Sequence, residues 1–438
     1  MSPGLSKCFN SSGDWFNQLI SVDGIIPETP LLVTTMKHMS NQAPTIEIDR
    51  SPTGADTGFS ATGLQCIRDE LDTEVAAANL PGAVVILVCN DRPAFAYATG
   101  YLDPVTRTPM CLDGLFRIYS MTKPLTSVAA MVLVEQGVLS LDDRIADRLP
   151  EMRGARGETT VLHLLLHASG LTYGTRSKDA SIRQAYEEFG LVVNPRDLDA
   201  QRLLYGLARV PLLHIPGTSW EYGLSTDLLG LMVESVTGQR LGTWLQQHVF
   251  GPLGMVDTAF QVMPAQRRRL AQPFARDPVD GTLIAAPDQT FDAASQPLLD
   301  SGGAGAISSA GDYMQFALML RGGGQHGGVK VLKADTVQCM TRDYISGRLA
   351  ARIAPGMAAM LSPGYGFGLG FGVRLKDEAA ELPGSPGFYF WSGTGGTMFW
   401  VDPVLQVAAV FMTQAPGLSR QSYRRWFVRR VYEALDRR

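Results

Sequence analysis

The sequence predicts an α/β fold in which one antiparallel sheet is flanked by helices and a helical domain is inserted into the chain. Three observations support this fold class. Strand patterns occur near both ends of the chain, at 83–99 and 396–412. The part between about 138 and 298 shows helical patterns joined by irregular connections. Helical patterns also precede the first strands and follow the last ones, so helices can cover the sheet.

The first predicted elements are a helix and a β-hairpin. Apolar residues recur at helical spacing over 61–79, and Pro81-Gly82 ends this helix. Residues 83–89 indicate a buried strand, and 94–99 return after a turn at 90–93. The helices expected in the middle of the chain span 160–168, 199–208, 226–237 and 241–249.

The last predicted elements complete the sheet. A helix over 309–321 follows a glycine-rich run at 302–305. Residues 365–372 alternate apolar residues with glycine, which predicts a strand with one face of bare backbone. A hairpin over 396–412 and an amphipathic helix over 420–435 come last.

Chain length and these patterns predict the domain organisation. The chain has 438 residues, which suggests two domains. We expect 61–137 and 299–438 to form a discontinuous α/β domain and 138–298 to form the helical domain. Residues 1–60 carry many Ser, Pro, Thr and Gly without periodicity, so we expect a weakly structured leader.

Composition excludes several classes of function. A net charge of -4 without a basic stripe argues against a nucleic-acid-binding protein. No apolar run approaches the roughly 20 residues that span a membrane. No signal peptide is evident, so we expect a cytoplasmic protein. The five cysteines are scattered, and His163 and His167 have no evident third ligand, so we expect neither a metal site nor a cofactor.

The first chemical motif is Ser120-Met-Thr-Lys123, followed by Pro124 at the start of a long apolar helix. Ser and Lys three residues apart at a helix start share one face, which places a hydroxyl beside an ammonium. A serine nucleophile without a histidine partner needs such an arrangement. The motif also fits a surface helix start capped by Ser. Of the seven lysines, only Lys123 follows a serine at this spacing.

Two later stretches supply the other groups that acyl transfer needs. Tyr222 follows a Pro216-Gly217 turn and could act as a phenolate base; one ammonium about 4 Å away supplies roughly the 4 kcal/mol needed to poise it. It could equally be a core aromatic residue. The run from Trp391 to Thr397 contains small residues whose backbone N–H groups could face a substrate, although it could also be a simple glycine-rich turn.

Together the three stretches resemble the serine β-lactamase and penicillin-binding protein superfamily. The likeness is closest to the family VIII carboxylesterases, which are similar to class C β-lactamases and carry Ser-x-x-Lys-Pro and a late Trp-x-Gly. Residues 164–171, Pro216-Gly217 and 401–403 also look like that group. The resemblance covers roughly 60–435 and implies a β-lactamase-like fold with the site between its two domains.

The resemblance implies roles by position. Ser120 would be the acylated nucleophile, with Lys123 and Tyr222 as a coupled base system. Which of the two takes the proton stays open. Backbone N–H groups of Ser120 and Thr394 would form the oxyanion hole. The residues implied in substrate binding are Trp391, Ser392, Gly393 and Leu224.

Two departures from the β-lactamase pattern point to the substrate. Leu224 stands where those enzymes usually carry Asn, and Trp391 stands where they carry Lys or His. Both lost groups would handle a substrate amide or carboxylate. Their absence favours neutral esters.

We therefore predict a hydrolase of short-chain carboxylic esters that works through an acyl-enzyme on Ser120, with weak β-lactam hydrolysis as a side activity. A small ester is the expected partner, without nucleic acid or membrane, and the oligomeric state stays open. The alternatives are a β-lactamase or D-amino-acid peptidase, an acyltransferase, and an inert binding module. The intact set of Ser120, Lys123 and Tyr222 counts against the last.

Overall fold

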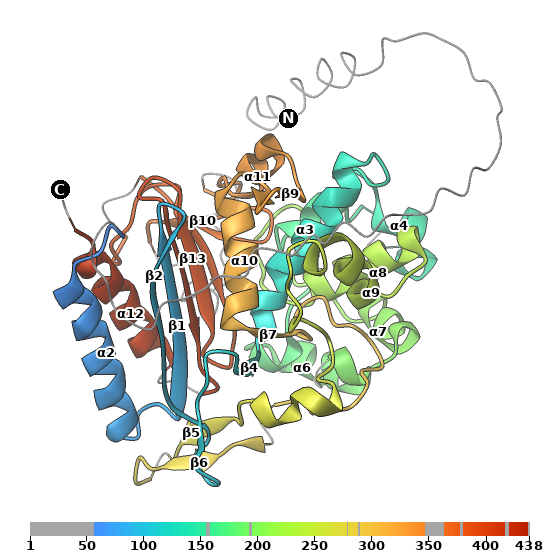
Figure 1. Ribbon diagram of the computed structural model, residues 1–438. Helices are drawn as coiled ribbons and strands as arrows, with labels where there is room; N and C mark the ends of the chain where they lie inside the picture. Colours follow the sequence, from blue (N-terminus) through green and yellow to red (C-terminus); the bar gives the residue numbers. More distant parts are fainter. Residues whose placement is uncertain are drawn as a thin grey trace, which may run out of the picture. The chain divides into compact units, whose positions relative to one another are not determined.

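The computed structural model describes residues 57–436, except 155–157, 192–194, 278, 288–289, 347–362, 377–379 and 417–419. The described chain is built in layers, which Figure 1 shows edge-on. Two helices cover one face of a sheet. A further helix and then the remaining helical part cover the other face.

The described residues form one eight-stranded sheet with the order β10-β11-β12-β13-β14-β1-β2-β3, and every neighbouring pair is antiparallel. Its strands are β1 (Gly82–Cys89), β2 (Arg92–Asp103), β3 (Thr108–Pro109), β10 (Tyr365–Phe367), β11 (Gly372–Arg374), β12 (Tyr389–Ser392), β13 (Met398–Asp402) and β14 (Val407–Met412). The pairing of β1 with β14 runs from Val84 opposite Met412 to Cys89 opposite Val407. This pairing joins the two ends of the chain, which confirms the predicted fold class.

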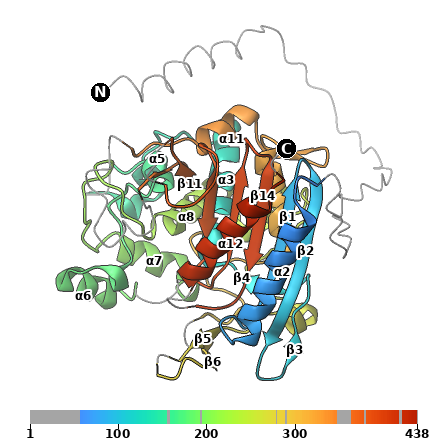
Figure 2. The same ribbon diagram turned by 90° about the vertical axis from the view of Figure 1, so that its left-hand side faces the viewer.

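The predicted helices occur in the expected order. The helices are α2 (Ala61–Ala76), α3 (Thr122–Glu135), α4 (Ile145–Arg148), α5 (Val161–Leu165), α6 (Ala180–Glu188), α7 (Ala200–Leu207), α8 (Ser225–Thr237), α9 (Leu241–Leu245), α10 (Ala310–Arg321), α11 (Ala334–Met340) and α12 (Arg420–Ala434). Among them, α4, α6 and α11 were not predicted. Figure 2 shows α2 and α12, which contact each other, lying across the outer face of the sheet. Short strand pairs complete the fold: β4 (Leu115–Arg117) with β7 (Ile307–Ser309), β5 (Phe274–Arg276) with β6 (Leu283–Ala285), and β8 (Gln325–His326) with β9 (Val329–Lys330).

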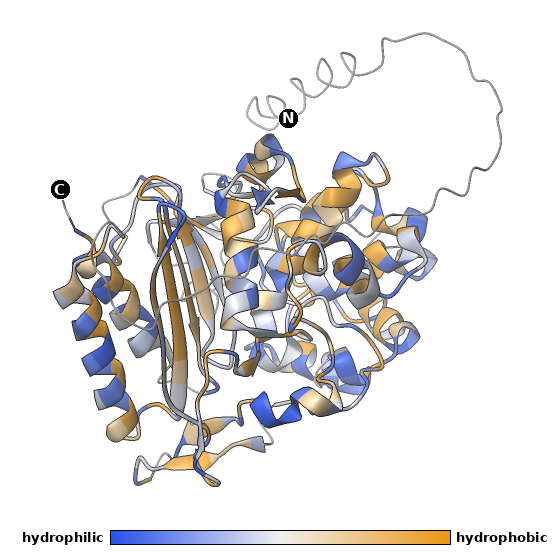
Figure 3. Cartoon of the chain, in the orientation of Figure 1, coloured by the Kyte–Doolittle hydropathy of each residue, from blue (hydrophilic) through white to orange (hydrophobic). Residues whose placement is uncertain are grey.

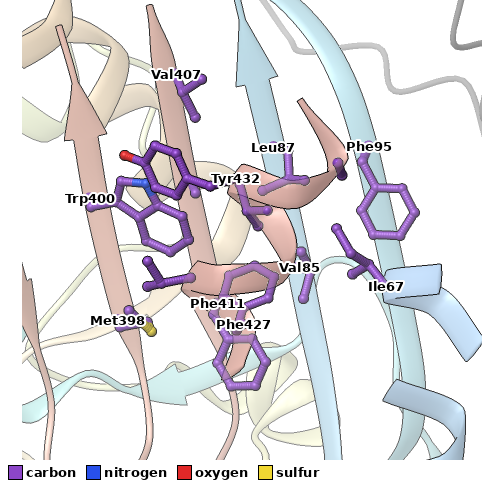
Figure 4. Packing of buried hydrophobic residues seen from close by; sticks show 14 of the residues in the cluster. Ile67, Val85, Leu87, Phe95, Met398, Trp400, Val407, Phe411, Phe427 and Tyr432 are labelled. Atoms are coloured by element: carbon purple, nitrogen blue, oxygen red, sulfur yellow. The ribbon is translucent and has the colours of Figure 1, made fainter. Parts of the chain in front are cut away.

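A hydrophobic core lies between the sheet and the helices α2 and α12. Strand side chains alternate between the two faces, so Val85 and Leu87 of β1 point into this core. Figure 4 shows them with Phe411 and Trp400 of the neighbouring strands and Phe427 of α12. Every residue of β1 is buried, because α10 covers the other face. Figure 3 accordingly shows the central strands as largely hydrophobic and α2 as amphipathic.

The segment 365–372 departs from the predicted single strand. It forms two short antiparallel strands, β10 and β11, with a turn between them. A Cβ on Gly368 would lie 2.2 Å from the carbonyl oxygen of Met340, and one on Gly370 would lie 2.2 Å from the Ser127 hydroxyl. Gly370 also has a φ of +98°. The glycines therefore let the chain reverse against α3 and α11, which a strand pattern does not reveal.

Two other regions differ from the expectations. The predicted helical part 138–298 also contains the β5–β6 pair. Phe59, which the prediction placed in the weakly structured leader, is fully buried and forms a β-bridge with Leu435. Residues 1–56 of that leader lie outside the described residues. The division into two domains stays a prediction.

None of the helices in the described ranges is long and apolar enough to cross a bilayer.

The core between the sheet and the helices α2 and α12 predicts the effect of shortening one side chain. Phe427 is fully buried, with its ring centroid 5.4 Å from that of Trp400 and 5.0 Å from that of Phe411. We expect Phe427→Ala to lower the free energy of unfolding by about 3–5 kcal/mol, because it leaves a cavity between α12 and the sheet. Urea unfolding measures this. Val404→Ala, at an exposed position beside the same sheet, is the matched control and should cost less than about 0.5 kcal/mol. An equal loss in both variants would contradict the packing described here.

Candidate active site

Ser120 lies in a single 3-10 turn, Tyr119–Met121, that leads directly into α3. The α-helix proper begins at Thr122, two residues later than predicted. Tyr119 has a φ of +44°, a conformation that is costly for a bulky residue and is held only by its surroundings. The Tyr119 hydroxyl donates to Thr290 Oγ1 at 2.6 Å. This strained turn leaves the Ser120 side chain half-buried, whereas its neighbours on both sides are buried.

The ammonium of Lys123 is the centre of the site. The side chain is 1% exposed and donates hydrogen bonds to three groups from different parts of the chain. Its Nζ lies 2.7 Å from the carbonyl oxygen of Gly303, 3.0 Å from the Tyr173 hydroxyl and 3.4 Å from Ser120 Oγ. The sequence therefore predicted the Ser120–Lys123 proximity correctly. Gly303 and Tyr173 were not predicted.

The surroundings keep Lys123 charged. Burial by itself lowers the pKa of the Lys123 ammonium, but the neighbouring Tyr173, Tyr222 and Asp227 outweigh burial and raise the pKa above its ordinary value. Burial raises the pKa of Asp227, with Lys123 and hydrogen bonds from Ser301 and Gly303 acting against that rise. The raised pKa of Lys123 agrees with the three hydrogen bonds that its side chain donates.

Tyr222 lies beside Lys123, and its role as a base stays a prediction. The Lys123 Nζ is 4.7 Å from the centroid of the Tyr222 ring. The ring packs against those of His167 and Trp391, at centroid distances of 4.6 and 5.5 Å. The Tyr222 hydroxyl is buried, and within the described part of the chain it has no hydrogen-bond partner. It is therefore available to a group that enters the site.

Tyr173 is a second phenol at the same ammonium. Its hydroxyl accepts the hydrogen bond from Lys123, and burial raises its pKa. Its ring centroid lies 5.6 Å from that of Tyr222. Sequence reasoning missed this residue, although it lies two residues after the family-like stretch 164–171. That position was the signal that could have identified it.

A hydrogen bond ties the two tyrosine segments together. Thr172 Oγ1 donates to Glu221 Oε1 at 2.6 Å, and both side chains are buried. Gly223 lies directly against the same segment. A Cβ at this position would be only 2.4 Å from the Cα of Thr172. The residues that precede Tyr173 and Tyr222 are thus locked together, which fixes the separation of the two phenols.

The glycine-rich run after residue 301 supplies the carbonyl that holds Lys123. Asp227 of α8 accepts hydrogen bonds from Ser301 Oγ at 2.5 Å and from the N–H of Gly303 at 3.1 Å. A Cβ on Gly303 would lie 2.3 Å from Asp227 Oδ2. The carboxylate thus holds the loop from one side and Lys123 holds it from the other. The sequence showed the glycine-rich run at 302–305 but did not indicate its contact with Lys123 and Asp227.

The third predicted stretch forms the turn between β12 and β13, and it lies against the Ser120 segment. A Cβ on Gly393 would be 2.2 Å from the carbonyl oxygen of Ile118, and one on Gly395 would be 2.6 Å from the Tyr119 ring. Only glycine permits this approach. Thr394 is half-buried and lies between these contacts. The turn therefore brings the Thr394 backbone close to the segment that contains Ser120.

The two residues that depart from the β-lactamase pattern are both buried, and Leu224 directly precedes α8. Leu224 and Trp391 are 1% and 3% exposed. The Trp391 ring packs against Tyr222 and also against Phe367, at 5.2 Å between centroids. Ser392, the next residue, is half-buried. The wall that Trp391 forms beside Tyr222 is apolar and aromatic.

The two histidines have structural partners. His163 belongs to the capping box of α5, where its Nδ1 accepts from the Thr160 N–H at 3.2 Å. Burial lowers the pKa of His167 well below its ordinary value, so its ring is neutral. Its Nε2 lies 3.3 Å from the Thr226 hydroxyl. In the part of the chain that the structure describes, no group of three or more His, Cys, Asp and Glu side chains could hold a metal ion.

Comparison with known proteins agrees with the geometry. The model of the family described as "Beta-lactamase" matches residues 67–433. The chain belongs to the beta-lactamase family. An uncharacterised protein of Mycobacterium tuberculosis is 32% identical over 394 residues, which cover 81% of this chain and 95% of that protein. Esterase EstB of Burkholderia gladioli is 31% identical over 390 residues, covering 84% of this chain and 93% of EstB.

A solved structure is similar over the same extent. EstCE1, described as a hydrolase with promiscuous acyltransferase activity, superposes with a TM-score of 0.71 at 26% identity and covers 85% of this chain and 98% of its own. The resemblance to the β-lactamase superfamily and its family VIII esterases is thereby confirmed, and so is the fold class. The roles of individual residues stay predictions.

Lys123 and Tyr222 form one proposed base system, so the effects of substituting them should not be additive. We expect Lys123→Ala and Tyr222→Phe each to lower ester turnover by roughly 10²- to 10⁴-fold, the contribution of a positioned acid–base group. The double variant should lose scarcely more than either single one, because residues that act as one unit are non-additive. Steady-state kcat measures this, with Tyr205→Phe on the surface as the matched control. A double variant whose loss equals the product of the two single losses would contradict the coupled base.

Proposed function

We propose that this protein is a serine carboxylesterase that hydrolyses small neutral esters through an acyl-enzyme on Ser120. The observation that carries this proposal is the buried, fully hydrogen-bonded ammonium of Lys123 within 3.4 Å of a half-buried serine hydroxyl. The similarity to EstB and to EstCE1 supports an ester as the substrate. The expected cytoplasmic location stays a prediction.

In the proposed first step, Ser120 Oγ attacks the ester carbonyl carbon while its proton passes to the base system. Lys123 already donates hydrogen bonds to Gly303 O, Tyr173 and Ser120, and its neighbours raise its pKa, so we assign it the role of a charge and not of the proton acceptor. It is suited to stabilise a phenolate, and Tyr222 has the hydroxyl without a partner in the described structure. We therefore propose that Tyr222 acts as a phenolate, which the Lys123 ammonium stabilises, and that it becomes the neutral phenol when it takes the Ser120 proton.

The tetrahedral intermediate places negative charge on the former carbonyl oxygen. Backbone N–H groups of Ser120 and Thr394 are proposed to bind that oxygen, since the glycine turn holds Thr394 close to the Ser120 segment. The alcohol leaves with the proton from the base. Water then gives its own proton to the base and attacks the acyl group, which releases the acid and restores Ser120.

The wall of the site favours a neutral ester over a β-lactam. A β-lactam presents an anionic carboxylate beside its scissile bond, and burial of an unpaired carboxylate is costly. Trp391 and Leu224 offer no charge or amide at the two positions where β-lactamases carry such groups. The indole instead adds apolar surface next to Tyr222.

Acyl transfer to an alcohol other than water is the second candidate function. It uses the same acyl-enzyme and differs only in the last acceptor. The description of EstCE1 as a hydrolase with promiscuous acyltransferase activity favours it. Product analysis of ester cleavage in the presence of a short-chain alcohol separates the two, since a transferase yields a new ester and a strict hydrolase yields only acid.

The nucleophile assignment predicts the outcome of one substitution. Ser120→Ala should abolish turnover of p-nitrophenyl butyrate and cost only about 1 kcal/mol of stability, because the hydroxyl is small and half-buried. Intact mass spectrometry after brief exposure to the ester should show the acyl adduct on the wild-type protein only. Ser140→Ala, at an exposed position, is the control and should retain both activity and adduct. Full activity of the Ser120 variant would rule out the proposed mechanism.

The apolar wall predicts substrate preference. A cationic partner for the β-lactam carboxylate would contribute roughly 1.5–3 kcal/mol, and that partner is absent at Trp391. We expect kcat/KM for p-nitrophenyl butyrate to exceed that for a chromogenic cephalosporin by at least about 100-fold, from the lost ion pair together with the lost amide contact. Both are measured in one buffer. Equal values for the two substrates would mean that Trp391 and Leu224 do not set the preference.

A further inference from the structure

The C-terminal helix α12 reaches the turn that contains Thr394. The guanidinium of Arg424 donates a hydrogen bond to the carbonyl oxygen of Gly393 and another, at 3.2 Å, to that of Thr397. The same two carbonyls also close the turn from within. Gly393 O accepts from the N–H of Gly396 at 3.1 Å, and Thr397 O accepts from the N–H of Gly393 at 2.9 Å. Arg424 therefore fastens both sides of the turn to α12.

The hydrogen bond from Arg424 to the Gly393 carbonyl also determines the direction of the Thr394 N–H. The Gly393 carbonyl and the Thr394 N–H belong to one peptide unit, and the described chain contains no cis peptide bond. In a planar trans unit the C=O and N–H point in opposite directions. A Gly393 carbonyl held toward Arg424 therefore turns the Thr394 N–H away from α12. In the described structure this N–H has no acceptor.

The turn needs such an anchor because of its composition. Gly393, Gly395 and Gly396 leave its backbone with unusual conformational freedom, and Gly396 has a φ of +109°. Gly393 and Gly395 are required by the close approach to Ile118 and Tyr119, whereas a Cβ on Gly396 would lie 2.5 Å from the Thr413 side chain. Stiffer residues thus cannot fix the turn, whereas charge-assisted hydrogen bonds from a planar guanidinium can. Such a donor also polarises the peptide unit and makes its N–H a better donor.

We propose that Arg424 is a positioning residue for the oxyanion hole, which it serves by holding the Gly393–Thr394 peptide so that the Thr394 N–H faces the substrate oxygen. This inference rests on the proposed function. It adds a residue of the C-terminal helix to the residues proposed for the active site. Arg424 acts through the peptide and does not touch the substrate.

The test compares Arg424→Ala and Arg424→Lys with Arg425→Ala. Arg425 is the next residue of α12; it is exposed and pairs with Glu381 at 3.0 Å, so its loss should leave turnover unchanged. Fluorophosphonate titration counts the competent sites, and kcat and KM are then measured for p-nitrophenyl butyrate. We expect Arg424→Ala to lower kcat per site by about 10- to 100-fold with KM changed less than about twofold, because an oxyanion donor acts mainly in the transition state. Arg424→Lys should fall between Arg424→Ala and the wild type.

Chemical rescue separates positioning from a general structural role. Millimolar guanidinium ion, well below denaturing concentrations, should restore part of the lost kcat in Arg424→Ala and should not affect Arg425→Ala. A kcat of Arg424→Ala within twofold of the wild-type value would overturn the inference. So would a loss confined to KM, which would mean that Arg424 binds the substrate instead. Failure of the wild-type protein to form any acyl adduct would reject the proposed function itself, which makes the two failures distinguishable.

Discussion

The buried ammonium of Lys123 is the interaction on which the rest of the site depends. A charge removed from water is tolerated only when partners surround it, and here the partners come from segments far apart in the sequence. Gly303 O and the Tyr173 hydroxyl accept its hydrogen bonds at 2.7 and 3.0 Å. Asp227 supplies the nearby negative charge and holds the Gly303 loop. The same ammonium therefore organises the helical part of the chain around Ser120 and prepares the site for a phenolate.

The second constraint is close backbone contact at the nucleophile. The β12–β13 turn lies so near to Ile118 and Tyr119 that only glycine fits at 393 and 395. Such a turn is pliable, and the guanidinium of α12 compensates for that. The sheet thus brings together the strained turn at Ser120, a hairpin from the last quarter of the chain and the last helix. Each of these contacts involves backbone atoms, so a small displacement of the β12–β13 turn would alter the site.

The sequence alone predicted the features whose pattern is local. Alternating or helical spacing located β1, β14, α2 and α12, and spacing within one turn placed Ser120 beside Lys123. It did not predict Tyr173, the Gly303 carbonyl or Arg424, because their importance arises from contacts between separate elements, across 27 to 180 residues of chain. The pattern at 365–372 was misread as one strand, since glycine alternation looks the same in a strand and in a tight reversal. Phe59 was assigned to the leader because a single buried residue has no periodicity.

The central claim is that Ser120, the Lys123 ammonium and the Thr394 N–H converge on one reacting carbonyl. A crystal structure of the protein after reaction with a p-nitrophenyl alkylphosphonate tests this most directly, because the phosphonyl oxygen occupies the position of the oxyanion. The account predicts a bond from phosphorus to Ser120 Oγ, with that oxygen about 2.7–3.1 Å from the backbone nitrogens of Ser120 and Thr394. It also predicts that Lys123 keeps its contact with Gly303. A phosphonyl group on another residue, or an oxygen directed away from Thr394, would contradict the account.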